Sequence, residues 1–142
     1  MQRGYDEVAD AYAALETQGA EWPRMRHLRN LLSILPSGAD VLDLYAIEHV
    51  PREEHGLLFE RFCRWLRPGG RLLFTLEAGG DEPGRTREWL GVPMFFSYYD
   101  AQVTRTLLEQ AGLFVERCDV ESQLEGEREI EYVWFHACKL SN

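Results

Sequence analysis

The chain has 142 residues, of which 45% are hydrophobic and 27% charged, and its formal net charge is −9. This length suits one compact domain, and the composition is that of a globular protein, which excludes a disordered or fibrous chain. The negative charge opposes a phosphate backbone, so we expect no nucleic-acid partner. No apolar run approaches the roughly 18–20 residues of a membrane span, and no signal segment follows Met1, so we expect a cytoplasmic protein without membrane contact.

Two helices and a strand are predicted in the first third of the chain. Apolar residues at helical spacing between Tyr5 and Leu15 indicate the first helix. A second helix begins near Pro23 and carries a leucine-rich stripe that ends before residues 36–38, Pro-Ser-Gly. Residues 39–47 are nearly all apolar after Asp40, which predicts a strand covered on both faces.

A helix, a strand and a long connection follow. Pro51 suits the start of a helix whose buried stripe is Leu58, Phe62, Trp65 and Leu66. Residues 71–77 form a short apolar strand bounded by glycines, and a strand after a helix predicts a parallel, right-handed crossover. Residues 78–99 are rich in glycine and proline and are predicted to be a long loop.

The last third predicts one helix and two strands. Asp100 is a good N-cap, and residues 111–112, Ala-Gly, end the helix. Residues 113–121 and 130–139 read as strands joined by a charged turn, so we expect them to be antiparallel neighbours. The elements together predict a single α/β domain over residues 1–142, with N-terminal helices at 1–38 and a sheet core at 39–142. We expect about four strands in a mixed sheet, parallel except for an antiparallel last strand, with helices on both faces.

Several segments resemble the class I S-adenosylmethionine-dependent methyltransferases that act on small molecules. The most specific is Arg64-x-Leu66-x-Pro68-Gly69-Gly70-x-Leu72, which is similar to the helix-to-fifth-strand motif of that family. Other similar segments, in chain order, are Tyr5-Asp6-x-Val8-Ala9-x-x-Tyr12, Ala39-Asp40-Val41-Leu42-Asp43-Leu44, residues 44–55 (LYAIEHVPREEH), residues 89–100 and residues 107–116. The resemblance implies a Rossmann-like methyltransferase fold and S-adenosylmethionine as cofactor.

The sequence departs from that family at one junction. In the family a glycine-rich loop follows the first strand and an acid ends the second strand, whereas here Leu44 runs directly into the segment that resembles the end of the fourth strand. About 60 residues are missing, since one βαβ motif takes about 30. We therefore expect a truncated fold that does not bind the cofactor normally and serves as a degenerate or assembly module. The alternative is an active small-molecule methyltransferase whose pocket is completed by dimerisation or by a partner chain.

The resemblance also implies roles for individual residues. Asp43 would lie beside the cofactor with the lid-helix residues Tyr5 and Tyr12, and His49 would face the reacting group as a general base. The substrate side would hold a possible small-molecule ligand and carry Trp89, Met94, Phe95 and Tyr98. Structural alternatives stay open: Asp43 as a relic, His49 as a helix cap, the two tyrosines as a buried stripe and the aromatic residues as a cap over the core.

No metal is expected, because the spacing of His49 and His55 matches no familiar zinc pattern. The junction instead predicts a partner. Loss of the flanking strands would leave the apolar segment from Asp40 to Ile47 at an edge of the sheet, and exposed edges pair readily. We expect a homodimer through this edge or through the adjacent helices.

Overall fold

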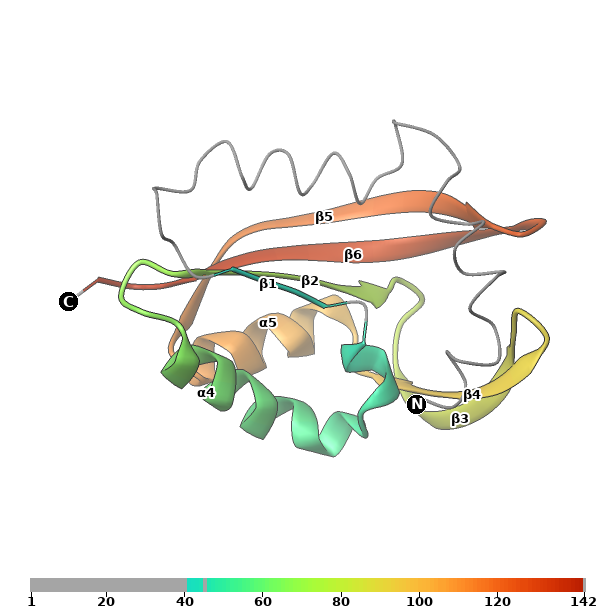
Figure 1. Ribbon diagram of the computed structural model, residues 1–142, viewed down its shortest axis with the longest axis horizontal. Helices are drawn as coiled ribbons and strands as arrows, with labels where there is room; N and C mark the ends of the chain where they lie inside the picture. The colour runs from blue at the N-terminus through green and yellow to red at the C-terminus, as the bar shows by residue number, and fades with distance from the viewer. Residues whose placement is uncertain (1–40, 45, 142) are drawn as a thin grey trace.

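A computed structural model describes residues 41–44 and 46–141, and of residues 41–44 only the backbone (Figure 1). The predicted helices at 1–38, and with them Tyr5 and Tyr12, lie outside the described residues. The elements, in chain order, are β1 (Val41–Leu44), the 3-10 helices η1 (Ile47–His49) and η2 (Arg52–Glu54), α4 (His55–Trp65), β2 (Arg71–Glu77), β3 (Glu82–Trp89), β4 (Val92–Tyr98), α5 (Ala101–Gln110), β5 (Leu113–Glu125) and β6 (Arg128–Lys139).

Four strands form a main sheet in the order β1-β2-β6-β5. β1 and β2 are parallel, with Leu42 opposite Leu72, and β6 runs antiparallel to both of its neighbours. β5 and β6 are joined at Glu125 and Arg128 by a tight turn in which Gly126 has a positive φ of 64°. A parallel neighbour would need a crossover of a dozen residues or more, so this short turn makes the last pair antiparallel.

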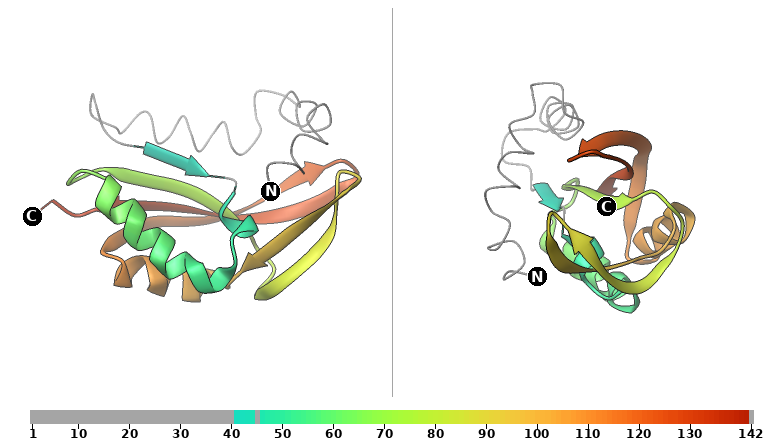
Figure 2. Two further views of the ribbon diagram at one scale, coloured as in Figure 1. Left: turned by 60° about the horizontal axis from the view of Figure 1, so that its bottom comes forward. Right: turned by 90° about the vertical axis from the view of Figure 1, so that its right-hand side faces the viewer.

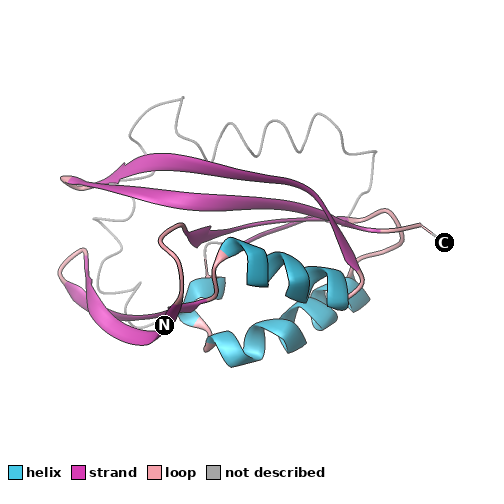
Figure 3. Ribbon diagram, turned by 180° about the vertical axis from the view of Figure 1, so that it is seen from behind, coloured by secondary structure: helices cyan, strands magenta, loops and turns pink. Residues whose placement is uncertain are grey.

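The prediction of a Rossmann-like sheet that is parallel except for its last strand is wrong. Antiparallel pairing dominates among the described strands, because the short β1 makes the one parallel pair there and β6 pairs antiparallel with both β2 and β5. Within the described residues, the two α-helices lie side by side on one face of the main sheet (Figures 1 and 3). Figure 2 shows the same layering from two further directions.

The predicted long loop at residues 78–99 is also wrong, because most of it forms a second, two-stranded antiparallel sheet, β3 and β4. Its turn has two residues, Leu90 and Gly91, between the paired residues Trp89 and Val92. Both turn residues have positive φ angles, 49° and 85°. This is the backbone of a type I′ turn, whose twist matches that of a hairpin. We call this segment the β3–β4 hairpin.

The strand predicted to continue to Ile47 ends earlier. β1 ends at Leu44, and Ile47 begins a 3-10 turn in which its side chain is buried in the core. The predicted helix after Pro51 starts as the 3-10 turn η2 and becomes α-helical at His55. The chain therefore bends out of the sheet directly after β1.

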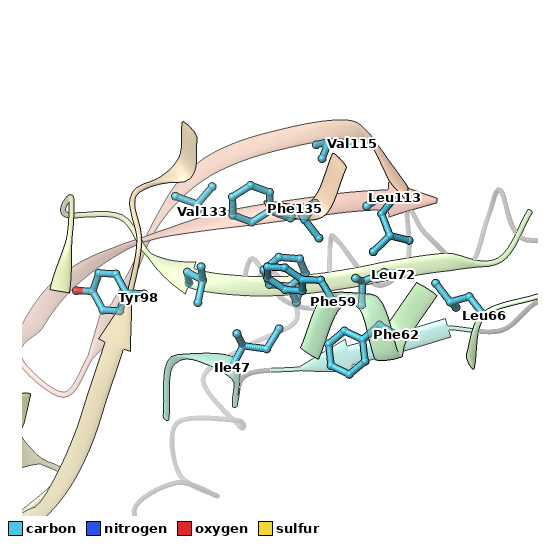
Figure 4. Packing of buried hydrophobic residues seen from close by; sticks show 14 of the residues in the cluster. Ile47, Phe59, Phe62, Leu66, Leu72, Tyr98, Leu113, Val115, Val133 and Phe135 are labelled. Atoms are coloured by element: carbon cyan, nitrogen blue, oxygen red, sulfur yellow. The ribbon is translucent and has the colours of Figure 1, made fainter. Parts of the chain in front are cut away.

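The core lies between the main sheet and the pair α4 and α5 (Figure 4). Phe59 of α4 packs on Phe74 of β2, which stacks on Phe135 of β6 at 4.9 Å between ring centroids. Leu108 of α5 is also fully buried, and Asp100 caps this helix by accepting a 2.8 Å hydrogen bond from the Val103 N–H. None of the described helices is long and apolar enough to cross a membrane.

Candidate functional site

Buried carboxyl groups gather where the parallel strands β1 and β2 end. Glu48 lies in η1, just beyond β1, and Glu77 is the last residue of β2. The backbone N–H of Glu77 donates to Oε2 of Glu48 at 3.3 Å, and both side chains are buried. The carboxyl ends of parallel strands are the usual ligand position in open α/β sheets, so this edge is the candidate site.

The β3–β4 hairpin supplies the partners of Glu77. Arg87 of β3 donates to Oε1 of Glu77, and the Tyr98 hydroxyl at the end of β4 donates to Oε2 at 2.8 Å. The guanidinium carbon of Arg87 also lies 3.9 Å from the ring centroid of Phe96, which adds a cation–π contact. Both oxygens of Glu77 are thus bonded within the chain.

A third carboxyl group completes the arrangement on the side of β5 and β6. Glu125 accepts hydrogen bonds from the Tyr132 hydroxyl at 2.6 Å and from the Trp89 indole at 3.0 Å. The side chain of Gln123 donates to Glu125 at 3.2 Å, and its own buried oxygen has no hydrogen-bond partner among the described residues. We use the name polar cluster for Glu48, Glu77, Arg87, Trp89, Tyr98, Gln123, Glu125 and Tyr132.

The electrostatics of the polar cluster favour the protonated forms of Glu48, Tyr98 and Tyr132. Burial raises the pKa of Glu48 well above 4.5, and repulsion from Glu77 and Glu125 raises it further, against the smaller effects of the Glu77 N–H and Arg87. Burial and the hydrogen bond to Glu77 raise the pKa of Tyr98, and burial and nearby carboxylates raise that of Tyr132. The cluster therefore holds three acids against one guanidinium, and Glu48 is the acid whose neutral form the surroundings favour.

His49 follows Glu48 and faces the hairpin. Its Nδ1 lies 2.7 Å from the carbonyl oxygen of Phe95, and its ring meets Phe96 edge-on at 4.9 Å between centroids. A carbonyl only accepts, so Nδ1 carries the proton and Nε2 is the basic nitrogen of the neutral ring. Burial lowers the pKa of His49, although the bond to Phe95 partly offsets this effect.

The other predicted site residues are distributed between this edge and the core. Asp43 lies in β1 opposite Leu73. Met94 and Tyr98 are buried among core residues, whereas Phe95 alternates outward on β4 and is partly exposed. Trp89 is bound to the polar cluster through its indole N–H. The structure thus brings His49, Trp89 and Tyr98 to the candidate site, while Met94 packs in the core.

The sequence analysis missed the acids Glu77 and Glu125 and the cation Arg87. Glu77 left a signal, because it is a charged residue at the carboxyl end of a strand whose middle is mainly apolar. Arg87 left none, since its segment was read as a loop. Among the described residues, no three side chains of histidine, cysteine, aspartate or glutamate are grouped as a metal site.

The structure is similar to solved structures of methyltransferases. A methyltransferase dependent on S-adenosylmethionine from Methanosarcina mazei matches with a TM-score of 0.56 and 16% identity, over 76% of this chain and 64% of that one. The 1,6-didemethyltoxoflavin-N1-methyltransferase of Burkholderia thailandensis, solved with 1,6-didemethyltoxoflavin and S-adenosylhomocysteine, matches with a TM-score of 0.53 and 19% identity, over 85% of this chain and 58% of that one.

A third match is a Listeria monocytogenes protein provisionally assigned as an S-adenosylmethionine-dependent methyltransferase. Its TM-score is 0.54 at 13% identity, over 84% of this chain and 78% of that one. No family model matches the chain, and no curated protein matches it. The chain spans less than two thirds of the length of the first two structures. Over most of its own length, the chain is structurally similar to S-adenosylmethionine-dependent methyltransferases.

Proposed function

We propose that this protein is a methyltransferase-like module that does not bind S-adenosylmethionine in the usual way and serves in binding or assembly. The observation that carries the proposal is the closed polar cluster at the carboxyl ends of β1 and β2. The hydrogen bonds from Arg87 and Tyr98 already occupy Glu77, which stands where a ligand of an open α/β sheet would be recognised.

The sequence at the junction supports the same proposal. Only Tyr45 and Ala46 separate β1 from the 3-10 turn η1, so no glycine-rich loop opens a helix after this strand. Such a loop supplies the backbone N–H groups that hold a cofactor at a helix N-terminus. We therefore regard the junction as an internal truncation of a methyltransferase-like ancestor. On this view the polar cluster occupies the carboxyl ends of β1 and β2, where the cofactor of that ancestor would have bound.

Isothermal titration tests the proposal directly. We expect the purified chain to give no saturable heat with S-adenosylmethionine or S-adenosylhomocysteine at concentrations well above micromolar. The Burkholderia thailandensis enzyme, whose structure holds S-adenosylhomocysteine, is the positive control under the same conditions. Micromolar binding by this chain, lost on Asp43→Ala, would contradict the proposal.

A second candidate function is methyl transfer in a pocket completed by another chain. One observation favours it. Burial lowers the pKa of His49, which favours the neutral imidazole, and its Nδ1–H donates to the carbonyl of Phe95, so Nε2 is the nitrogen that can act as a base. In this case His49 would accept a proton from the methyl acceptor.

Mass spectrometry distinguishes the two candidates. The second predicts methylated product from a panel of small acceptors, with at least a 100-fold loss of rate on His49→Ala, since general-base catalysis contributes about 10²–10⁴-fold. His136→Ala is the control, because His136 lies in β6 and pairs with Leu73 rather than facing the hairpin. Absence of product with every acceptor would leave the binding module as the function.

A further inference from the structure

The outward face of α4 carries a basic and apolar surface in a strongly acidic chain. Arg61 and Arg64 are exposed, and neither forms an ion pair in the part of the chain that the structure describes. Leu57 and Trp65 lie at helical spacing beside them and are 48% and 65% exposed. We call these four residues the α4 surface. Tryptophan and arginine are the residues most enriched at interface hot spots.

A second surface of opposite charge lies on the far part of the β5–β6 pair. β2 ends at Glu77, opposite Tyr132, so the turn end of β5 and β6 extends beyond it as an arm (Figure 1). Val120 and Leu124 of β5 are 59% and 56% exposed on one face of the arm. The register places Glu129 opposite Leu124 and Glu131 two residues further on, so both share that face. We call Val120, Leu124, Glu129 and Glu131 the arm surface.

The two surfaces are complementary in composition and spacing. Each has two exposed apolar side chains and two like charges, and the side chains of Glu129 and Glu131 form no ion pair among the described residues. The arginines, three residues apart on a helix, are about 5–6 Å apart. The glutamates, two residues apart on a strand, are about 7 Å apart, which allows each to face one guanidinium.

We propose that the protein forms a twofold homodimer in which the α4 surface of each copy binds the arm surface of the other. The helix α4 and the turn end of β5 and β6 lie apart in the molecule (Figures 1 and 2). In a twofold dimer the α4 surface of each copy would meet the arm surface of the other, so that the contact would form twice and leave neither surface free. Of the two dimer contacts expected from the sequence, this one uses the helix next to β1. The inference rests on the proposed assembly function and specifies its partner as a second copy.

Charge reversal tests the contact. Sedimentation velocity of the full chain at micromolar concentration should show a dimer that weakens as salt rises. The variants Arg61→Glu/Arg64→Glu and Glu129→Arg/Glu131→Arg should each be monomeric, because in each variant the two surfaces carry the same charge. Mixing the two variants should restore a dimer, since both contacts of the mixed pair are again complementary.

Two further variants guard the interpretation. Arg85→Glu/Arg105→Glu changes the net charge by the same amount as Arg61→Glu/Arg64→Glu, but at positions away from both surfaces. It should dimerise like the parent chain. Trp65→Ala should raise the dissociation constant about 30-fold, as expected for a central aromatic anchor. If a reversed variant lacks the parent circular dichroism, Trp65→Ala decides the question alone.

The proposal is overturned if the parent chain is monomeric, if both reversed variants still dimerise, or if their mixture stays monomeric. These outcomes are independent of titration with S-adenosylmethionine. A chain that binds the cofactor and dimerises as described would contradict the proposed function and support the interface. A monomer that does not bind the cofactor would contradict the interface and leave the absence of normal cofactor binding standing.

Discussion

Glu48 is a carboxyl group whose proton the fold helps to retain. Its folded pKa is raised by burial and by Glu77 and Glu125, whereas the unfolded value is close to 4.5. A raised acid pKa means that the folded state binds the proton more tightly. The associated stability is therefore fully present below the unfolded pKa and is lost as the pH rises through the folded pKa.

We predict that Glu48→Gln removes this loss of folding stability at rising pH. The free energy of unfolding of the parent should fall with rising pH above about 4.5, by up to about 1.4 kcal/mol per pH unit for one proton. The Gln variant should show a flatter profile and become the more stable of the two toward alkaline pH. Urea unfolding across the pH range measures this, with exposed Glu60→Gln as the control. Parallel profiles for Glu48→Gln and the parent would refute it.

At the same scale, part of the candidate site was predictable from sequence. His49 was predicted to lie at the candidate site, and the structure places it in η1 just beyond β1, where a single apolar run ends. Arg87 and Glu125 were not predictable. Arg87 reaches the site through the pairing of β3 with β4, a segment that the sequence analysis read as a loop. Glu125 reaches it because β5 continues past residue 121 into the segment read as a charged turn.

The β3–β4 hairpin shows how one turn decides an element. Leu90 adopts a φ of 49°, a left-handed conformation that costs a leucine roughly 1–2 kcal/mol. Type I′ turns prefer Asn-Gly at these two positions. The sequence Leu90-Gly91 is therefore a weak form of a strong signal, which is why residues 78–99 read as a loop.

We predict that Leu90→Asn stabilises the protein by about 0.5–1 kcal/mol, since asparagine tolerates the left-handed conformation. Gly91→Val should destabilise it by more than that, because a β-branched residue cannot adopt the φ of 85° without strain. Thermal unfolding of both variants measures the pair. Equal melting temperatures for Leu90→Asn and Gly91→Val would show that the turn does not limit hairpin stability.

Other elements were predictable because their signals are local. The strand at Arg71–Glu77 and the helix capped by Asp100 agree with the sequence prediction, since bounding glycines and an N-cap act within a few residues. Of the stripe predicted to be buried on α4, Phe62 and the C-cap residue Leu66 are buried, but Trp65 is largely exposed. Helical spacing alone does not distinguish the edge of a buried stripe from a surface residue.

At the scale of the whole molecule, the sheet order could not be read from the elements. β6 follows β5 in sequence but lies between β5 and β2. Its pairing with β2 joins segments far apart in the sequence, and such long-range register has no local sequence signal. The prediction of a Rossmann-like sheet extended a rule for parallel sheets to a sheet that is mainly antiparallel. The described helices instead pack together over one face, where Phe59 and Leu108 meet the strands.

The central place of β6 also sets the order in which the chain can fold. β2 and β5 are made before β6, yet neither can pair with a neighbour on its inner side until β6 has been made. The apolar edge of β2 is thus exposed for the whole interval in which α5 and β5 are synthesised. During synthesis on the ribosome, β2 would be a binding site for chaperones and a point of aggregation, and release of β6 would be the event that commits the domain to its native sheet.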